Sequence, residues 1–214
     1  MSDEDTGAAA APEVRTRASI PLIVIAAVLS AAIGAGAMFL WNTASTPGED
    51  SAEAGFLRDM STHHAQAVEM SIYEYQYGEN ENMRAIAYDI LTAQQGEIGA
   101  MRSLLNQWDL DVTHSDPMEW TDMDMDMGEN GLMGGMATPE QMAEFKTLTG
   151  AEADLRFAEL MTAHHEGGIH MAQMAVDLAE EDVVVDMARR MVAVQKQEVK
   201  DMKVHVDAIE AGGA

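Results

Sequence analysis

The segment FLRDMSTHHAQAVEM at residues 56–70 returns as FAELMTAHHEGGIHM at residues 157–171. The two copies share five anchors, namely a Phe, a Met, two adjacent His and a second Met, and each anchor recurs 101 residues later. A constant displacement of all five anchors indicates an internal duplication. The sequence therefore predicts two copies of one structural unit, each presenting the same Met and His side chains.

The spacing of the anchors is typical of one face of an α-helix. At about 100° per residue, the Phe, both His and the second Met of each copy lie within about 80° of its first Met. Ala67 and Gly168 lie midway along this face, where a small side chain would let a ligand or another helix come close. His170 lies on the opposite face and is a weaker candidate than its neighbours.

Two interpretations of this face compete. Met residues at helical spacing are most often core, and a single His on such a face is commonly structural. Two duplicated His pairs are harder to explain as packing, because four buried imidazoles without partners would be costly. Imidazole and thioether groups are ligands for soft metal ions. The candidate metal ligands are Met60, His63, His64, Met70, Met161, His164, His165 and Met171.

Each copy is expected to form one helix of an antiparallel hairpin. Periodicity and capping residues predict helices at about 52–77, 81–108, 151–179 and 182–209, with Gly78 as a C-terminal cap and a short helix after Thr138. A hairpin with one apolar face cannot bury that face alone. The sequence therefore predicts an all-α, antiparallel four-helix bundle at 54–209, made of hairpins 54–112 and 139–209.

The duplication extends into the partner helices, where Gln94, Glu97 and Met101 recur as Gln195, Glu198 and Met202. The two Glu fall on the predicted inward faces, where a carboxylate could orient a histidine ring; solvation at the edge of the face remains the alternative. These faces are predicted to contain Ile86, Ile90, Ala93, Glu97, Met101 and Leu104, and Met187, Met191, Val194, Glu198, Met202 and His205. Further candidate ligands are His170, Met174, Glu97, Glu198, Met101 and Met202.

The N-terminal region predicts a membrane segment. Residues 20–41, IPLIVIAAVLSAAIGAGAMFLW, contain no charged side chain and are long enough to cross a bilayer. Arg15 and Arg17 precede the segment, which favours a cytoplasmic tail at 1–18, an anchor at 19–41 and a bundle outside the cytoplasmic membrane after a linker at 42–53. A cleaved signal peptide is the alternative, because Ala35-Gly36-Ala37 resembles a cleavage site and would give a secreted protein.

The composition restricts the partners and the metal chemistry. The chain has no Cys, so disulfides and thiolate metal sites are excluded. Its 37 acidic and 12 basic residues give a formal charge of −25, which repels nucleic acid and attracts cations. Solubility alone is an equally good explanation of this charge. No nucleic-acid partner is expected.

Between the copies, residues 113–138 form a Gly-, Asp- and Met-rich segment without helical periodicity, which predicts a mobile loop with no role in the core. Alternating Asp and Met suggest a calcium loop, but Gly128 comes one place late and Met133 replaces the bidentate Glu. Thioethers instead favour Cu(I). The lower-ranked candidate ligands here are Met123, Met125, Met127, Met133 and Met136.

The doubled Met60-x-x-His63-His64 and Met161-x-x-His164-His165 motifs, followed by Met70 and Met171, resemble the DUF305 family over about residues 54–209. This resemblance implies a ferritin-like four-helix bundle in a small exported or membrane-tethered protein. Some members resemble copper-tolerance proteins that bind Cu(I) or Ag(I) through Met and His. Transferred to this chain, the resemblance points to the eight ligands of the two motifs.

These observations predict a non-enzymatic protein that sequesters or relays Cu(I), and also Ag(I), with a metal-exchange protein as a partner. A ferritin-like di-iron enzyme is one alternative, but it requires Glu-x-x-His motifs, and the chain contains none. A metal-free structural bundle is the other alternative. It would have to explain four His in two identical pairs as packing.

Overall fold

The computed structural model describes the chain except residues 1–19, 45, 114–115, 122–126, 128–130 and 213–214. The predicted cytoplasmic tail therefore lies outside the described residues. The chain divides into two units, Met1–Thr46 and Pro47–Ala214. The first unit contains the helix α1 (Ile20–Ala44). Across the described part of the chain, no helix combines the length and the apolar character that crossing a membrane requires.

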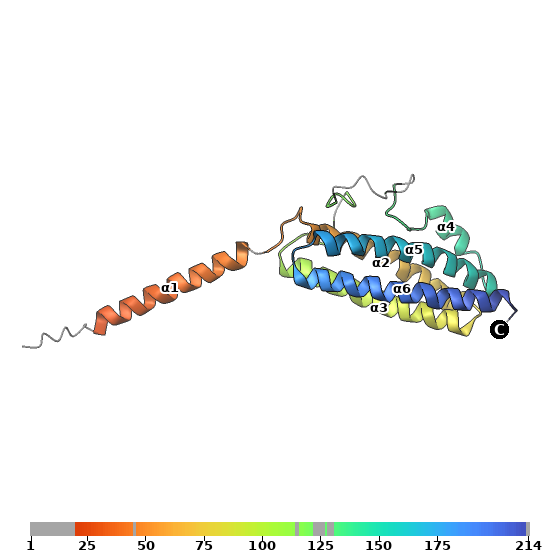
Figure 1. The fold of residues 1–214 in the computed structure, drawn as a ribbon, viewed down its shortest axis with the longest axis horizontal. Helices are drawn as coiled ribbons and strands as arrows, with labels where there is room; N and C mark the ends of the chain where they lie inside the picture. The colour runs from red at the N-terminus through yellow and green to blue at the C-terminus, as the bar shows by residue number, and fades with distance from the viewer. Residues whose placement is uncertain (1–19, 45, 114–115, 122–126, 128–130, 213–214) are drawn as a thin grey trace, which may run out of the picture. The chain divides into compact units, whose positions relative to one another are not determined.

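The second unit is a bundle of four long helices (Figure 1), namely α2 (Ala52–Tyr77), α3 (Glu81–Gln107), α5 (Ala151–Leu178) and α6 (Asp182–Glu210). α2 packs against α3 and α5 packs against α6, and the two hairpins meet mainly through α2 and α5. A short helix, α4 (Pro139–Phe145), precedes α5. The described residues contain no β-strand, so the predicted all-α fold is confirmed.

Side-chain caps start three of these helices. The Ser51 hydroxyl accepts a hydrogen bond from the backbone N–H of Ala54 at the start of α2. The Asn80 amide oxygen accepts two backbone N–H groups at the start of α3. Thr138 and Gln141 form the reciprocal capping box of α4. Each cap satisfies N–H groups that the first turn of a helix leaves without a partner.

Gly78 ends α2, but its backbone is extended, with φ −67° and ψ 158°, and not left-handed. The reason for a glycine is therefore space. A Cβ at this position would lie 2.1 Å from Glu74 Oε1 and 2.6 Å from Asp154 Oδ1. Burial, followed by a hydrogen bond to Asp154, raises the pKa of Glu74 to about 9. Glu74 is therefore protonated at neutral pH and donates to the carboxylate of Asp154.

The prediction for the inward faces of α3 and α6 is partly wrong. Ala93 and Val194 are exposed, whereas Gln94 and Gln195, one position later, are buried. The helices are rotated so that a polar amide faces inward at the middle of each one. Apolar periodicity could not predict this rotation, because it counts a buried Gln as solvated. The residues buried on both faces are Met83, Ala87, Ile90, Gln94, Ile98, Met101 and Leu105, and Val184, Val185, Met187, Ala188, Met191, Gln195 and Met202.

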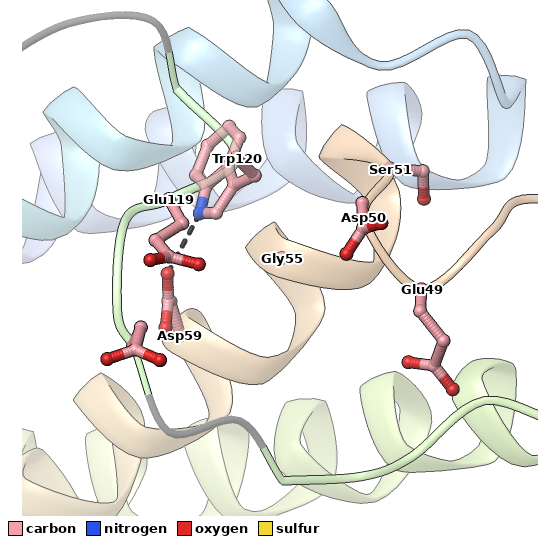
Figure 2. A pocket seen from close by; sticks show the side chains of 8 residues that line it. Glu49, Asp50, Ser51, Gly55, Asp59, Glu119 and Trp120 are labelled. Carbon is pink, nitrogen blue, oxygen red and sulfur yellow. Dashed lines mark hydrogen bonds between the residues drawn. The ribbon is translucent and has the colours of Figure 1, made fainter.

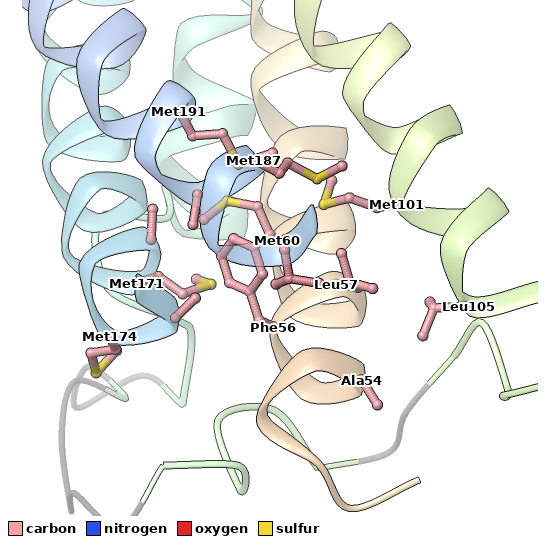
Figure 3. Packing of buried hydrophobic residues seen from close by; sticks show 14 of the residues in the cluster. Ala54, Phe56, Leu57, Met60, Met101, Leu105, Met171, Met174, Met187 and Met191 are labelled. Atoms are coloured by element: carbon pink, nitrogen blue, oxygen red, sulfur yellow. The ribbon is translucent and has the colours of Figure 1, made fainter. Parts of the chain in front are cut away.

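The apolar core consists of two clusters. The first contains Met60, Met101 and Met171, and Figure 3 shows Met60 of α2 between Met101 of α3 and Met171 of α5. The second contains the duplicated counterparts Met161 and Met202 together with Met70. Each cluster therefore combines Met residues from several helices, and the duplication relates Met60, Met101 and Met171 to Met161, Met202 and Met70.

The prediction that residues 113–138 have no role in the core is wrong for the described part of this segment. Met118 and Met133 are buried in the first cluster, and Met136 packs against it. The Asp59 carboxylate accepts from the backbone N–H of Met118 at 2.7 Å and from Trp120 Nε1 at 2.8 Å. Polar anchors on α2 thus hold apolar side chains of an acidic segment against the bundle, which composition alone does not indicate.

Candidate metal centre

The four His of the duplicated motifs lie together between α2 and α5. Each of the four has at most 1% of its surface exposed. The rings of His63 and His164 are in contact, with centroids 3.7 Å apart and planes inclined by 36°. The centroid of His165 lies 6.4 Å from that of His164. The structure therefore gathers imidazoles from both hairpins into one buried layer, hereafter the His layer (His63, His64, His164 and His165).

A carboxylate from the partner helix orients one ring in each hairpin. Nε2 of His64 lies 2.8 Å from Glu97 Oε2, and Nε2 of His165 lies 2.8 Å from Glu198 Oε2. A carboxylate only accepts, so Nε2 carries the hydrogen and donates in both pairs. The two Glu are thus bonded to the rings and not simply solvated. The bond leaves the lone pair of each ring on Nδ1, the tautomer required for coordination through that atom.

The other two rings donate to backbone carbonyls. His164 Nε2 lies 3.0 Å from the carbonyl oxygen of His63, and His63 Nε2 lies 3.1 Å from that of Gly134. Perfect duplication symmetry would pair His63 with the backbone of His164. The loop replaces this contact, so the segment around Gly134 closes over one side of the His layer.

Several buried atoms of the layer have no hydrogen-bond partner. No partner is present for Nδ1 of His63, His64 and His165. The same is true of Oε1 of two buried residues outside the layer, Gln94 and Gln195. An unsatisfied buried polar atom costs about 1–3 kcal/mol. Three imidazole Nδ1 atoms are therefore held in the core without a hydrogen-bond partner.

Burial keeps the rings of His63 and His164 neutral. Desolvation, followed by repulsion from His64, lowers the pKa of His63 from 6.5 to about 3. Desolvation and the neighbouring rings also lower the pKa of His164 well below its ordinary value. A neutral imidazole has the lone pair that a metal ion requires, so the two rings are competent ligands even in mild acid.

Gly168 brings the hairpins close at this level. A Cβ on Gly168 would lie 2.6 Å from Gln195 Oε1 and 3.3 Å from His63 Cε1, so only a glycine admits both side chains. Sequence reasoning gave no role to Gln94 and Gln195. Their recurrence at the same interval as the His pairs was the available signal, and the structure places both at the level of the bundle where the helices approach.

The predicted thioether ligands flank the His layer in the two core clusters. Met60, Met101 and Met171 lie in the first cluster, and Met70, Met161 and Met202 lie in the second. Met174 is buried in the first cluster, and His170 is half-buried on the same helix. Among the described residues, no three His, Asp or Glu side chains converge as a metal site.

The loop candidates have different environments. Met127 is 40% exposed and forms a single β-bridge with Met133, which is 5% exposed. Met136 is half-buried. Met123 and Met125 lie outside the described residues. Met133 therefore belongs to the core, although the sequence predicts that the Met residues of this loop are not packed. Met127 is accessible to solvent.

An acidic pocket lies at the N-terminal end of α2. Its lining includes the acidic residues Glu49, Asp50, Asp59 and Glu119, and its volume is about 180 Å³. Figure 2 shows the Asp59 and Glu119 side chains beside Trp120, with Asp50 and Glu49 near the start of α2. A Cβ at Gly55 would meet the Trp120 side chain at 2.2 Å, which explains the glycine. Oxygen ligands of this type suit hard cations and not soft ones. The pocket therefore contributes negative potential and is not the candidate soft-metal site.

Comparison with known proteins supports the fold. The family model of a domain of unknown function, DUF305, matches residues 53–206. A DUF305 protein of Streptomyces coelicolor is 41% identical, with a TM-score of 0.69, over 78% of this chain and 97% of that chain. A DUF305 fragment from Deinococcus radiodurans is 25% identical, with a TM-score of 0.62, over 73% and 95% of the two chains.

More distant structures share the fold alone. The Cu(I)-bound form of CopM is 20% identical, with a TM-score of 0.56, over 73% of this chain and 96% of that chain. No curated protein matches the chain. On the family match and the Streptomyces relative together, this chain belongs to the DUF305 family.

Proposed function

We propose that the protein binds a soft metal ion, Cu(I) and also Ag(I), and sequesters or relays it without catalysing a reaction. The single observation that carries this proposal is the set of imidazole lone pairs in the His layer. Nδ1 of His63, His64 and His165 is buried without a partner, while Nε2 of each ring is committed to an acceptor. Such an arrangement orients each ring so that its Nδ1 faces the buried layer and can serve as a metal ligand.

The donor set favours a soft ion. Neutral nitrogen and thioether sulfur suit Cu(I), whereas Mg²⁺ and Ca²⁺ prefer oxygen. The chain supplies sulfur ligands only as Met, because it contains no Cys. Solved relatives with the same fold include the Cu(I)-bound and Ag-bound forms of CopM, at 20% and 22% identity. Ag(I) is expected to follow Cu(I), because both are soft monovalent ions.

The metal-free structural bundle is the main alternative. It accounts for the two His–Glu hydrogen bonds, which join α2 to α3 and α5 to α6. It does not account for three buried Nδ1 atoms without donors, each of which costs about 1–3 kcal/mol in a bundle that never binds metal. A di-iron site is disfavoured, because Glu97 and Glu198 already accept from imidazole and Glu-x-x-His motifs are absent from the sequence.

The decisive experiment replaces His64 and His165 together by Gln in the full-length protein. The Gln amide can donate to Glu97 or Glu198 as Nε2 does, but it offers no Nδ1 lone pair. Competitive titration with Ag(I), and with Cu(I) under reducing conditions, is expected to show affinity reduced by at least about 100-fold, or about 2.7 kcal/mol. Circular dichroism is expected to show the helical content of the wild type.

His205→Gln is the matched control, because this half-buried His of α6 lies outside the His layer. The control should bind Ag(I) as the wild type does. Unchanged binding by the double variant would contradict the proposal, and so would a wild type that binds neither ion. If the double variant unfolds less easily than the metal-free wild type, the proposal is supported, because the variant lacks the buried Nδ1 atoms of His64 and His165 that have no hydrogen-bond partner.

We also propose that the bundle lies outside the cytoplasmic membrane and is tethered through residues 20–41. The supporting observation is the uncharged stretch preceded by Arg15 and Arg17. Protease treatment of intact spheroplasts should degrade the bundle if it is extracytoplasmic. The mass of the mature protein distinguishes an anchor from a cleaved signal, and protection from the protease would contradict the proposed location.

A further inference from the structure

A small cavity beside the loop is lined by soft ligands. Its walls are formed by Met118 and Gly134 of the loop and by Gly167, His170, Met171 and Met174 of α5. The cavity volume is about 20 Å³. A cavity of about 10–15 Å³ is enough for a single water molecule, so this one has room for one small ion and little more. Three Met residues and one His therefore line a small cavity with about the volume of one metal ion.

This cavity shares two lining residues with a wider groove that is open to solvent. His170 and Met174 also line an open groove of about 480 Å³ between α5 and α6, together with Gln173, Val176, Asp177 and Arg189. A cation that enters the groove would therefore meet these two soft ligands first. Both residues thus border the open groove and the small cavity.

Two residues of the cavity wall also contact the interior of the bundle. Met171 lines the cavity and belongs to the same core cluster as Met60 and Met101. Gly134, on the opposite wall, accepts the hydrogen bond from His63 Nε2. The same two wall residues thus touch the thioether set and the His layer.

Close packing fixes the loop wall of the cavity. A Cβ on Gly167 would lie 1.9 Å from the carbonyl oxygen of Gly134, and a Cβ on Gly135 would lie 2.2 Å from that of Ala163. Only glycines at these positions let the loop backbone lie directly on α5. Met118 is held from the other side, because its backbone N–H donates to Asp59 in the acidic pocket. The cavity is therefore formed by defined contacts of the loop with α2 and α5.

We infer that Met118, His170, Met171 and Met174 form an entry site for a soft monovalent metal ion, through which the ion reaches the His layer. This entry site rests on the proposed metal-binding function and adds a location and a route to it. Met118 supplies a ligand outside the duplicated motifs, so the entry site has no counterpart in the other hairpin. The negative potential of the acidic pocket, which shares the 116–120 segment, raises the local concentration of cations near Met118.

The test uses full-length protein with Met118→Leu and Met174→Leu together, titrated with Ag(I) alone. Met→Leu nearly conserves volume, so folding is expected to persist while two thioethers are lost. We expect the bound Ag(I) to fall by one equivalent and the association rate in stopped flow to fall by at least about tenfold, or about 1.4 kcal/mol in activation free energy. The control is Met83→Leu with Met142→Leu, two buried Met of the second cluster that do not line the cavity.

A second measurement does not depend on variants that fold well. In wild-type protein labelled with ¹³C at the Met methyl groups, the resonances of Met118 and Met174 should shift at the first substoichiometric additions of Ag(I). The order of the shifts is the observable, because an entry site is occupied no later than the interior. Shifts at Met60 and Met161 without any at Met118 or Met174 would overturn the inference.

The outcomes separate this inference from the proposed function. If the wild type binds no Ag(I), both fail. A second outcome refutes only the entry site. In that outcome the wild type binds Ag(I) and the His64→Gln, His165→Gln variant does not. The Met118→Leu, Met174→Leu variant then binds Ag(I) with the rate and stoichiometry of the wild type. A lost equivalent with an unchanged rate refutes the route, because the site then holds an ion that is not on the path to the His layer.

Discussion

The free energy of unfolding of the metal-free bundle should pass through a maximum near pH 6.5. Buried histidines reduce it below this pH, and a buried glutamic acid reduces it above this pH. His63 and His164 are buried as neutral rings, and desolvation lowers the pKa of both, to about 3 for His63. Glu74 is buried as a neutral acid, and the pKa of its carboxyl is raised from 4.5 to about 9. Folding therefore releases protons below pH 6.5 and takes one up above it.

The expected magnitudes follow from proton linkage at about 1.4 kcal/mol per pH unit for each group. A group whose pKa is raised by folding stabilises the protein fully at pH values below its unfolded-state pKa, and this stabilisation is lost as the pH rises towards its folded-state pKa. The bundle should therefore lose about 2.7 kcal/mol of stability through Glu74 between pH 6.5 and 8.5. A lowered His pKa gives stability that is present above 6.5 and lost as pH falls. The two His should together cost about 3 kcal/mol between pH 6.5 and 5.0, because an unfolded ring is only half protonated at pH 6.5, and Glu74 offsets about 2 kcal/mol of this loss.

The informative variant is Glu74→Gln, whose amide can donate to Asp154 as the protonated acid does. Urea unfolding of metal-free protein, followed by circular dichroism between pH 5 and 8.5, gives the free energy of unfolding of variant and wild type. We expect the variant to lose the decline above pH 6.5 and to decline more steeply below it. Glu166→Gln removes one charge from an exposed position of α5 and should leave the shape of the curve unchanged.

Parallel curves for Glu74→Gln and wild type above pH 6.5 would refute the assignment of a protonated Glu74. A variant whose stability does not decline below pH 6.5 would refute the assignment of buried neutral rings to His63 and His164. Because each limb depends on different residues, the two assignments fail independently.

Three further predictions concern single positions. Gly78→Ala should destabilise the bundle by about 2 kcal/mol or more in thermal unfolding, because its Cβ would meet Glu74 Oε1 at 2.1 Å; a change below 0.5 kcal/mol would show that the turn relaxes. Glu97→Gln should weaken Ag(I) binding by about 10- to 100-fold in competitive titration, because the ring of its hydrogen-bonded His loses an orienting carboxylate; full affinity would show that the ring is held by packing alone. Met133→Ala should cost about 2–3 kcal/mol in urea unfolding and Met127→Ala less than about 0.5 kcal/mol, because the first side chain is 5% exposed and the second 40%; equal effects would contradict the packing of the loop.

Local sequence signals were sufficient for the helices of the bundle. The caps at Asn80 and Thr138 and the apolar periodicity predict α2 to α6 to within a few residues, because these signals act over one or two turns. The constant interval of 101 residues predicts that two equivalent hairpins pair. The same duplication identifies Glu97 and Glu198 as positions worth examining, although the sequence left their role open between ring orientation and solvation.

Tertiary structure alone decided the contacts that join distant segments. Gly134 accepts from His63 across 71 positions of sequence, and Met118 is held by Asp59 across 59 positions. No local pattern encodes either contact, because each depends on how the acidic loop packs on α2 and α5. Periodicity likewise cannot show that Gln94 and Gln195 are buried, since it reads an amide as a solvated group. The sequence by itself therefore determined the helices, their duplication and the candidate ligands, whereas three-dimensional packing determined which lone pairs are buried without a partner and which Met side chains enclose a cavity.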